Sequence, residues 1–131
     1  MAPTQILIVE DESVVALDIQ SRLMRLGYAV PAIASSGEEA VRRTEKLRPA
    51  LVLMDIHLGS ANGLWLVKAL RSGDTCPDVP VIVVTSDQMQ DTVREAAGLN
   101  VQGYLLKPYQ PSLLVEKVEA VLARRPARPR I

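Results

Sequence analysis

The sequence predicts an α/β protein in which five βα units form one doubly wound, five-stranded parallel sheet. Short apolar runs alternate five times with amphipathic stretches, which is typical of parallel strands joined by crossover helices. Runs such as Ile6-Leu7-Ile8-Val9 are apolar throughout, and such runs indicate a sheet that is covered on both faces. A chain of 131 residues is long enough to bury one core without metal or disulfide support.

The expected elements alternate along the whole chain. We expect strands at 5–9, 28–34, 50–54, 79–84 and 101–106, and helices at 13–26, 37–47, 63–72, 88–97 and 111–124. In the first helix the apolar residues Val15, Ile19, Leu23 and Leu26 recur at helical spacing, and Gly27 ends it. Each later apolar run likewise precedes an amphipathic stretch, so the βα unit repeats to the end of the chain.

Pro31 supports the expected order of the strands. A proline inside a strand has no N–H for the hydrogen-bond ladder, so the second strand should lie at an edge of the sheet. Right-handed crossovers leave few orders, and the simplest for five units is the flavodoxin-like order 2-1-3-4-5, in which strand 2 is an edge. Ligands of such sheets bind at the carboxyl ends of the strands where the order reverses, between strands 1 and 3.

Composition and charge narrow the class of protein. The folded domain is expected to span 1–123, and 124–131 to form a basic Arg/Pro tail or the start of a linker. The net charge is zero, but four arginines lie in the last eight residues, and without them 11 basic residues face 15 acidic ones. That balance argues against direct binding of nucleic acid by the folded part.

Cysteine usage and hydropathy indicate the compartment. Cys76 is the one cysteine, so an intramolecular disulfide is excluded and a reducing compartment is expected. The N-terminus lacks a secretory signal, and no run approaches the roughly 18 apolar residues of a membrane span. The sequence therefore predicts a cytoplasmic protein without membrane insertion.

Three carboxylates follow strands 1 and 3, at the expected switch point. Glu10 and Asp11 follow the first apolar run, and Asp55 ends the third. Ionised carboxylates ~4 Å apart repel by about 4 kcal/mol per pair at an effective dielectric of ~20, and a divalent cation removes that penalty. Oxygen ligands favour Mg2+, or Mn2+ in its place; acidic caps on the following helices are the alternative, plausible for Glu12 or Ser13.

The next two strands add the remaining groups of a possible phosphoryl site. Thr85 ends the fourth apolar run and Lys107 follows the fifth. Carboxylate, metal, ammonium and hydroxyl together suit phosphoryl transfer, in which Asp55 would be the nucleophile. The sequence has no glycine-rich phosphate loop of the P-loop type, so the phosphate donor should be small or carried by a protein.

The motifs that hold these residues resemble the receiver domain of two-component response regulators, typified by the chemotaxis regulator. They are Ile8-Val9-Glu10-Asp11-Glu12, Leu51-Val52-Leu53-Met54-Asp55 with Asn62-Gly63, Val83-Val84-Thr85-Ser86, and Tyr104-Leu105-Leu106-Lys107-Pro108. The resemblance covers roughly 5–123. It implies that Asp55 takes a phosphoryl group from a phosphohistidine on a sensor histidine kinase or a histidine phosphotransfer protein.

The resemblance also implies roles for individual residues. Glu10, Asp11, Asp55 and the backbone carbonyl of His57 would arrange the Mg2+, while Thr85 and Lys107 would hold the phosphoryl oxygens. The Lys107-Pro108 bond would be cis. Such a domain is not an enzyme that turns over a metabolite, because it catalyses only its own phosphorylation and dephosphorylation.

Signalling would follow from the same contacts. Thr85 would turn toward the phosphate and Tyr104 would rotate into the space, changing the face built from the fourth helix, fifth strand and fifth helix. That face would bind a downstream protein or a second copy of the chain. Alternatively, Tyr104 is an aromatic residue of an edge strand whose hydroxyl meets solvent. Trp65 is interpreted as a packing residue of the third helix.

Several departures and alternatives accompany this interpretation. Gly59 stands where the family commonly has proline, and His57 and Asp87 stand where the family tunes the lifetime of the phosphate. A hydrolase of the haloacid dehalogenase type would need an aspartate where His57 stands. A flavodoxin-like cofactor binder, a non-phosphorylated interaction domain, and the receiver part of a larger regulator or hybrid histidine kinase are the other readings.

Overall fold

One five-stranded parallel sheet with helices on both faces forms the protein. The computed structural model describes residues 3–58, 61–74, 76–86 and 98–124. The elements of the sheet and its helices are β1 (Ile6–Val9), α1 (Ser13–Arg25), β2 (Ile33–Ala34), α2 (Gly37–Leu47), β3 (Leu51–Asp55), α3 (Leu64–Ser72), β6 (Val81–Thr85), β7 (Gly103–Leu106) and α5 (Pro111–Ala123). The strand order β2-β1-β3-β6-β7 confirms the predicted order 2-1-3-4-5.

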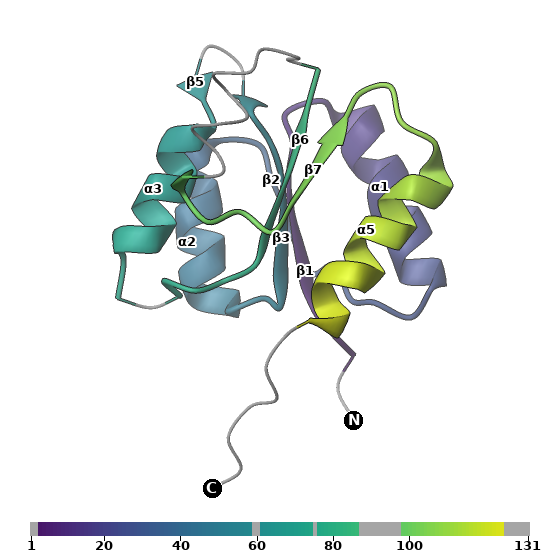
Figure 1. Cartoon of the computed structure of the whole chain (residues 1–131), viewed down its shortest axis with the longest axis horizontal. Coiled ribbons are helices and arrows are strands. Elements are labelled where there is room, and N and C mark those ends of the chain that lie inside the picture. Colours follow the sequence, from purple (N-terminus) through teal and green to yellow (C-terminus); the bar gives the residue numbers. More distant parts are fainter. Residues whose placement is uncertain (1–2, 59–60, 75, 87–97, 125–131) are drawn as a thin grey trace, which may run out of the picture.

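The helices lie in two layers, with α2 and α3 on one face of the sheet and α1 and α5 on the other (Figure 1). Alternate strand residues point to opposite faces, so the sheet divides the core into two clusters. Leu7 and Val9 of β1 join the cluster under α2 and α3. Ile6 and Ile8 join the cluster under α1 and α5. Every residue of β1, β3 and β6 is buried, as expected for a covered parallel sheet.

The strand register brings the carboxyl ends of neighbouring strands to the same edge. Val9 pairs with Met54 across β1 and β3, and Asp55 pairs with Val84 across β3 and β6. Thr85 pairs with Leu106 across β6 and β7. The residues that follow these positions therefore meet at one edge of the sheet.

The start of α2 is held by two reciprocal hydrogen bonds beside that edge. The hydroxyl of Ser36 accepts from the N–H of Glu39, at 3.2 Å, and the Glu39 carboxylate accepts from the N–H of Ser35, at 2.9 Å. Such caps contribute about 1 kcal/mol to helix stability. The indole of Trp65, 41% exposed, lies against Gly37, where an added Cβ would collide with the ring. Trp65 therefore packs α3 against the first turn of α2.

The second strand is shorter than expected. Strand 28–34 was predicted, but β2 holds two residues, and an isolated parallel bridge joins Gln5 to Ala29 before it. Pro31 lies between the bridge and β2, and its missing N–H interrupts the ladder. The side chain of Gln20 on α1 donates to the carbonyl of Val30, at 3.1 Å, so α1 holds the chain just before Pro31.

Two further findings concern segments outside the main sheet. The loop after β3 contains a hairpin of β4 (His57–Leu58) and β5 (Ala61–Asn62) that the sequence did not predict. The helix expected at 88–97 lies outside the described residues. Within the described ranges, none of the helices has the length and hydropathy needed to cross a membrane.

Candidate functional site

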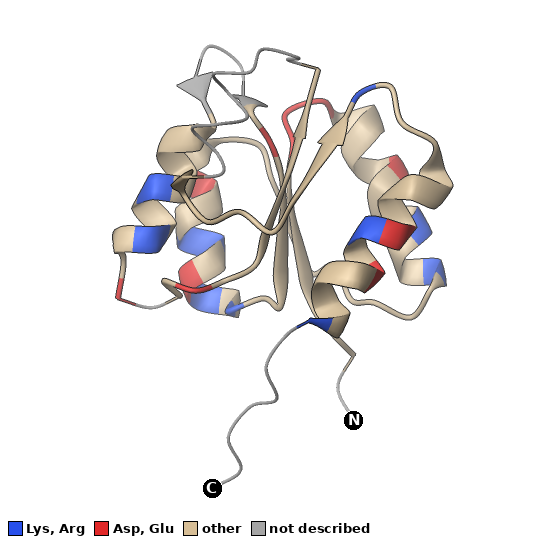
Figure 2. Ribbon diagram, viewed as in Figure 1, with Lys and Arg blue, Asp and Glu red and all other residues tan. Residues whose placement is uncertain are grey.

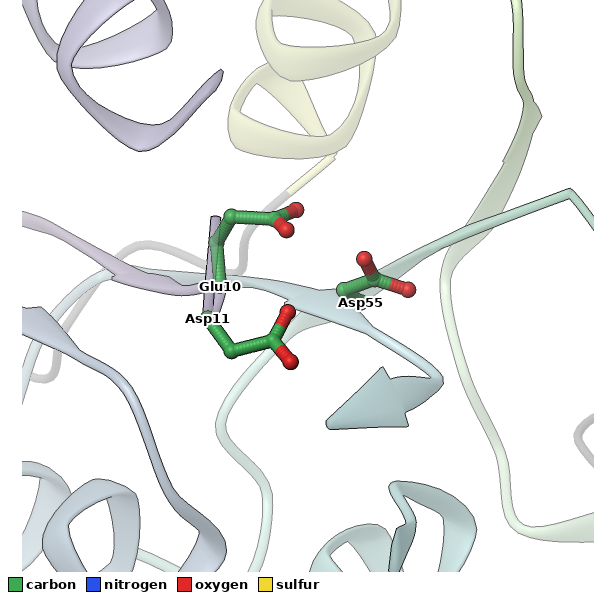
Figure 3. A group of neighbouring side chains, drawn as sticks. All are labelled: Glu10, Asp11 and Asp55. Carbon is green, nitrogen blue, oxygen red and sulfur yellow. The ribbon is translucent and has the colours of Figure 1, made fainter. Parts of the chain in front are cut away.

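Three carboxylates converge at the carboxyl edge of β1 and β3. Glu10 and Asp11 follow β1, Asp55 ends β3, and one oxygen from each lies within 4.8 Å of the other two. Figure 3 shows the three carboxylates turned toward a common space. Glu10 and Asp55 are 3% and 5% exposed, whereas Asp11 is exposed. Buried carboxylates this close need a positive charge between them.

Lys107 supplies a positive charge from the residue that follows β7. Its Nζ lies 2.9 Å from Oδ2 of Asp55 and 3.4 Å from Oε2 of Glu10. Acidic segments at the ends of β1 and β3 and a basic one after β7 are visible at this edge in Figure 2. One ammonium therefore bridges the buried carboxylates of two neighbouring strands.

The electrostatics of this cluster change the pKa of two groups. Burial, and next the charge and hydrogen bond of Asp55, raise the pKa of Glu10 from 4.5 to about 7. The hydrogen bond from the N–H of Glu12 and the positive charge of Lys107 oppose this rise. Burial alone would lower the pKa of Lys107, but the hydrogen bond and charge of Asp55, with those of Glu10, raise it. Lys107 thus remains charged, and Glu10 is ready to lose a proton when a cation approaches.

Thr85 and Tyr104 occupy the neighbouring strands. Thr85 ends β6 and is 2% exposed, and its carbonyl accepts from the N–H of Lys107, at 2.8 Å. Tyr104 lies in β7, half-buried against the cluster under α2 and α3, and burial raises the pKa of its phenol. The peptide bond between Lys107 and Pro108 is cis.

The loop after β3 is tightly built. The backbone of His57 pairs with Asn62 in the β4–β5 hairpin, and the N–H of Gly63 donates to the carbonyl of Ile56. A Cβ on Gly63 would lie 2.8 Å from the carbonyl oxygen of Asp55, so this position has no room for a side chain. The side chain of His57 and residues Gly59 and Asp87 lie outside the described part of the chain.

An open cavity lies beside Lys107, between α1 and the start of α5. It has a volume of about 510 Å³, with Val15, Ile19 and Leu114 among its lining residues and Glu12 at the side of the carboxylates. Lys107 therefore lines this cavity and also contacts the buried carboxylates.

Two contributors to the cluster were not predicted. The N–H of Glu12 donates to Oε1 of Glu10, at 3.3 Å, and no sequence signal marks such a contact because almost every residue offers an N–H. The crowding at Gly63 had a signal, since Asn62-Gly63 is a dipeptide that marks tight turns.

The donor set fits a hard divalent cation. All three side chains offer carboxylate oxygens, which Mg2+ prefers, and cluster residues Glu10 and Asp55 would lose their mutual repulsion on binding it. Among the described residues, this is the one group of three or more ligand side chains close enough to share a metal ion. The ammonium of Lys107 beside such a cation suits the charge of a phosphoryl group.

Comparison with known proteins matches this chain to response regulators. A family model described as "Response regulator receiver domain" matches residues 6–119. The chain is 30% identical over 122 residues to "Transcriptional regulatory protein PdtaR" of Mycobacterium tuberculosis, covering 93% of this chain and 58% of that protein. It is 32% identical over 117 residues to "Chemotaxis protein CheY" of Thermotoga maritima, covering 89% and 96%.

Solved structures agree with the sequence comparison. A CheY-like response regulator receiver domain protein from Methanospirillum hungatei JF-1 is similar with a TM-score of 0.85 and 26% identity, covering 92% of this chain and 94% of that one. The chain spans less than two thirds of the PdtaR length and nearly all of the CheY length.

Proposed function

This chain belongs to the response regulator receiver domain family of two-component signalling, and we propose from that premise that Asp55 accepts a phosphoryl group from a phosphohistidine. Receiver domains are signalling domains that interact with histidine kinases and downstream targets. The observation that carries the proposal is the ammonium of Lys107, which lies 2.9 Å from Asp55 at the edge where the strand order reverses.

The proposed reaction is a transfer between two side chains. An oxygen of Asp55 attacks the phosphorus, a P–O bond forms, and the P–N bond breaks. The histidine leaves with the electron pair of that bond and takes up a proton. Lys107 and the hydroxyl of Thr85 donate to the phosphoryl oxygens as charge moves onto them. Hydrolysis later returns Asp55 when water attacks the phosphorus, so no metabolite is turned over.

The carboxylates of Glu10, Asp11 and Asp55 and the backbone carbonyl of His57 would hold the cation. Mg2+, or Mn2+, would neutralise phosphoryl oxygens when bound there. The convergence of three carboxylate oxygens within 4.8 Å and the raised pKa of Glu10 both support a cation at this position.

The proposal is tested by a small phosphodonor. Incubation of the protein with Mg2+ and acetyl phosphate should add one phosphoryl group per chain, as measured by intact mass. The adduct should be labile to hydroxylamine, as acyl phosphates are. A chain that stays unmodified while a known receiver domain is phosphorylated in parallel would contradict the proposal.

Mg2+ affinity should depend on pH through Glu10. Because a ligand carboxylate must be deprotonated, the Kd for Mg2+ should be constant above about pH 8 and weaken below pH 7, by up to about tenfold per unit. Titration calorimetry at several pH values measures this. In Glu10→Gln the affinity should be lower, and the pH dependence between 6 and 8, roughly the range of the Glu10 pKa, should flatten.

Thermal unfolding also tests the role of Glu10, because the stability of the metal-free protein should fall as the pH rises, whereas the affinity for Mg2+ should increase. The pKa of Glu10 is higher when folded than its ordinary 4.5, so its contribution to stability is complete below about 4.5 and is lost as the pH rises through about 7. Mg2+ should therefore raise the Tm more at pH 8 than at roughly pH 6. Equal increases at both values would contradict the assignment of Glu10.

The phosphodonor would be a sensor histidine kinase or a histidine phosphotransfer protein that approaches from the α1 side. Val14 and Leu17, in the first turns of α1, are 82% and 57% exposed, and α1 begins two residues after Asp11. Exposed apolar residues beside a reactive group support a protein partner rather than a nucleotide.

The output surface would lie around β7 and α5. Tyr104 is half-buried in the edge strand β7, while Leu106 and Leu113 are 45% and 38% exposed. A turn of Thr85 toward the phosphate would free space for Tyr104 and alter this surface. A downstream protein or a second copy of the chain would bind it, and the expected contribution of 88–97 lies outside the described residues.

A further inference from the structure

A half-buried arginine joins helix α3 to the two segments that lead into β6 and β7, at the edge of the sheet opposite Asp55. Arg71 lies in the last turn of α3. Its Nε donates to the carbonyl of Leu99, at 3.1 Å, and its Nη1 donates to those of Pro77 and Val79, at 3.1 and 2.8 Å. Its Nη2 donates to the carbonyl of Asn100, at 3.0 Å, and to Oε1 of Gln102, at 3.4 Å.

These contacts use all five N–H groups of the guanidinium. All five of these acceptors are neutral oxygens, so the hydrogen bonds to the guanidinium come from peptide and amide dipoles. Burial lowers the pKa of Arg71, and the charge of Asp78 opposes that effect. Partial burial of a cation costs desolvation free energy, which well-formed hydrogen bonds offset. Lysine, with three donors at one point, cannot reproduce the planar fork of donors that makes them.

The acceptors belong to two separate segments of the chain. Residues 77–79 lead into β6, and residues 99–102 lead into β7. Gln102 joins the segments directly, because its Oε1 accepts from the N–H of Val81, at 2.8 Å, and its own N–H donates to the carbonyl of Val81, at 2.9 Å. Its Nε2 also donates to the carbonyl of Asn100, at 2.9 Å.

The turn before β7 takes a conformation that needs such support. Asn100 has φ 59, in the left-handed region, which asparagine tolerates better than most residues but still at a cost. The carbonyls of Leu99 and Asn100 both face the guanidinium of Arg71. The turn is therefore fixed by α3 and not by its own residues alone.

The two strands that Arg71 fixes are the ones that carry Thr85 and Lys107. The metal-binding carboxylates come from β1 and β3 instead. Strands paired in register transmit a shift at their starts to their ends, and a misplacement of about 1 Å can cost 10²-fold in rate. We propose that Arg71 is a positioning residue, which sets the place of Thr85 and Lys107 relative to Asp55 without contacting the phosphoryl group. This inference rests on the proposed function.

The test compares Arg71→Lys with Arg43→Lys, a charge-conserving change at an exposed position on α2. With acetyl phosphate and saturating Mg2+, Arg71→Lys should slow phosphorylation by on the order of 10- to 100-fold, while its Kd for Mg2+ stays within about twofold. Arg43→Lys should leave both unchanged. Gln102→Leu, which keeps Arg71 but removes the bridging amide, should give a smaller loss of rate in the same direction.

Hydrogen exchange supplies a readout that is independent of phosphorylation. The Lys107 N–H, bonded to Thr85, should exchange faster in Arg71→Lys, whereas the Glu10 N–H, bonded to the carbonyl of Ala34 at 2.9 Å, should keep its rate. Equal acceleration of both amides, or a parallel loss of Mg2+ affinity, would indicate a general loss of stability and overturn the inference. An unchanged phosphorylation rate would also overturn it, whereas an unmodified wild-type protein would instead contradict the proposed function.

Discussion

Asp55→Asn should give a folded protein that acetyl phosphate and Mg2+ no longer modify. The amide keeps the shape of the side chain at the end of β3 but has no carboxylate oxygen to attack phosphorus. Intact mass should show no detectable adduct under conditions that convert the wild-type chain fully. Asp74→Asn, at an exposed position after α3, removes the same charge away from the site and should be modified at the wild-type rate.

An adduct on Asp55→Asn formed at the wild-type rate would move the acceptor to another residue. Peptide mapping of that adduct would then identify the residue, with Glu10 and Asp11 as the neighbouring carboxylates. Loss of the adduct in both variants would point to an effect of net charge and not of Asp55 itself.

Lys107→Met should reduce the phosphorylation rate by about 10² to 10³, the usual effect of removing one donor to developing charge. Its Nζ, now 2.9 Å from Asp55, is replaced by a methyl group that cannot donate. The affinity for Mg2+ should not fall, because a positive charge that competes with the cation has been removed. Single-turnover phosphorylation and a Mg2+ titration on the same sample measure the two quantities.

Lys46→Met provides the matched control, because Lys46 is exposed on α2. It should keep the wild-type rate and the wild-type Kd for Mg2+. A Lys107→Met protein that is phosphorylated within about threefold of the wild-type rate, well below the effect expected for a lost donor, would contradict the role of the ammonium.

The strands and their order were predictable because the relevant signals are local and periodic. The apolar runs at Ile6–Val9 and Val81–Thr85 are buried strands, and the missing N–H of Pro31 indicated an edge. Since strand ends meet at one edge in this topology, the proximity of Glu10 and Asp55 followed from sequence. The same proline, however, limits β2 to two residues, because without an N–H it cannot continue the hydrogen-bond ladder with β1.

The remaining contacts join residues whose types are common and whose spacing carries no pattern. Arg71 and Leu99 are 28 positions apart, and a helix-terminal arginine usually remains in solvent. The β4–β5 hairpin has two residues in each strand, too few for an alternating pattern to appear. Such features depend on the assembled fold and become visible only with it.

The sheet acts as a partition between two nearly independent interiors. Leu66 and Val67 belong to the cluster under α2 and α3, whereas Leu23 and Val118 belong to the one under α1 and α5. Substitutions in separate clusters share no partners and should act additively. Redesign at positions such as Leu66 and Val67 should therefore leave unchanged the interior under α1 and α5 and the cavity beside Lys107 that this interior borders.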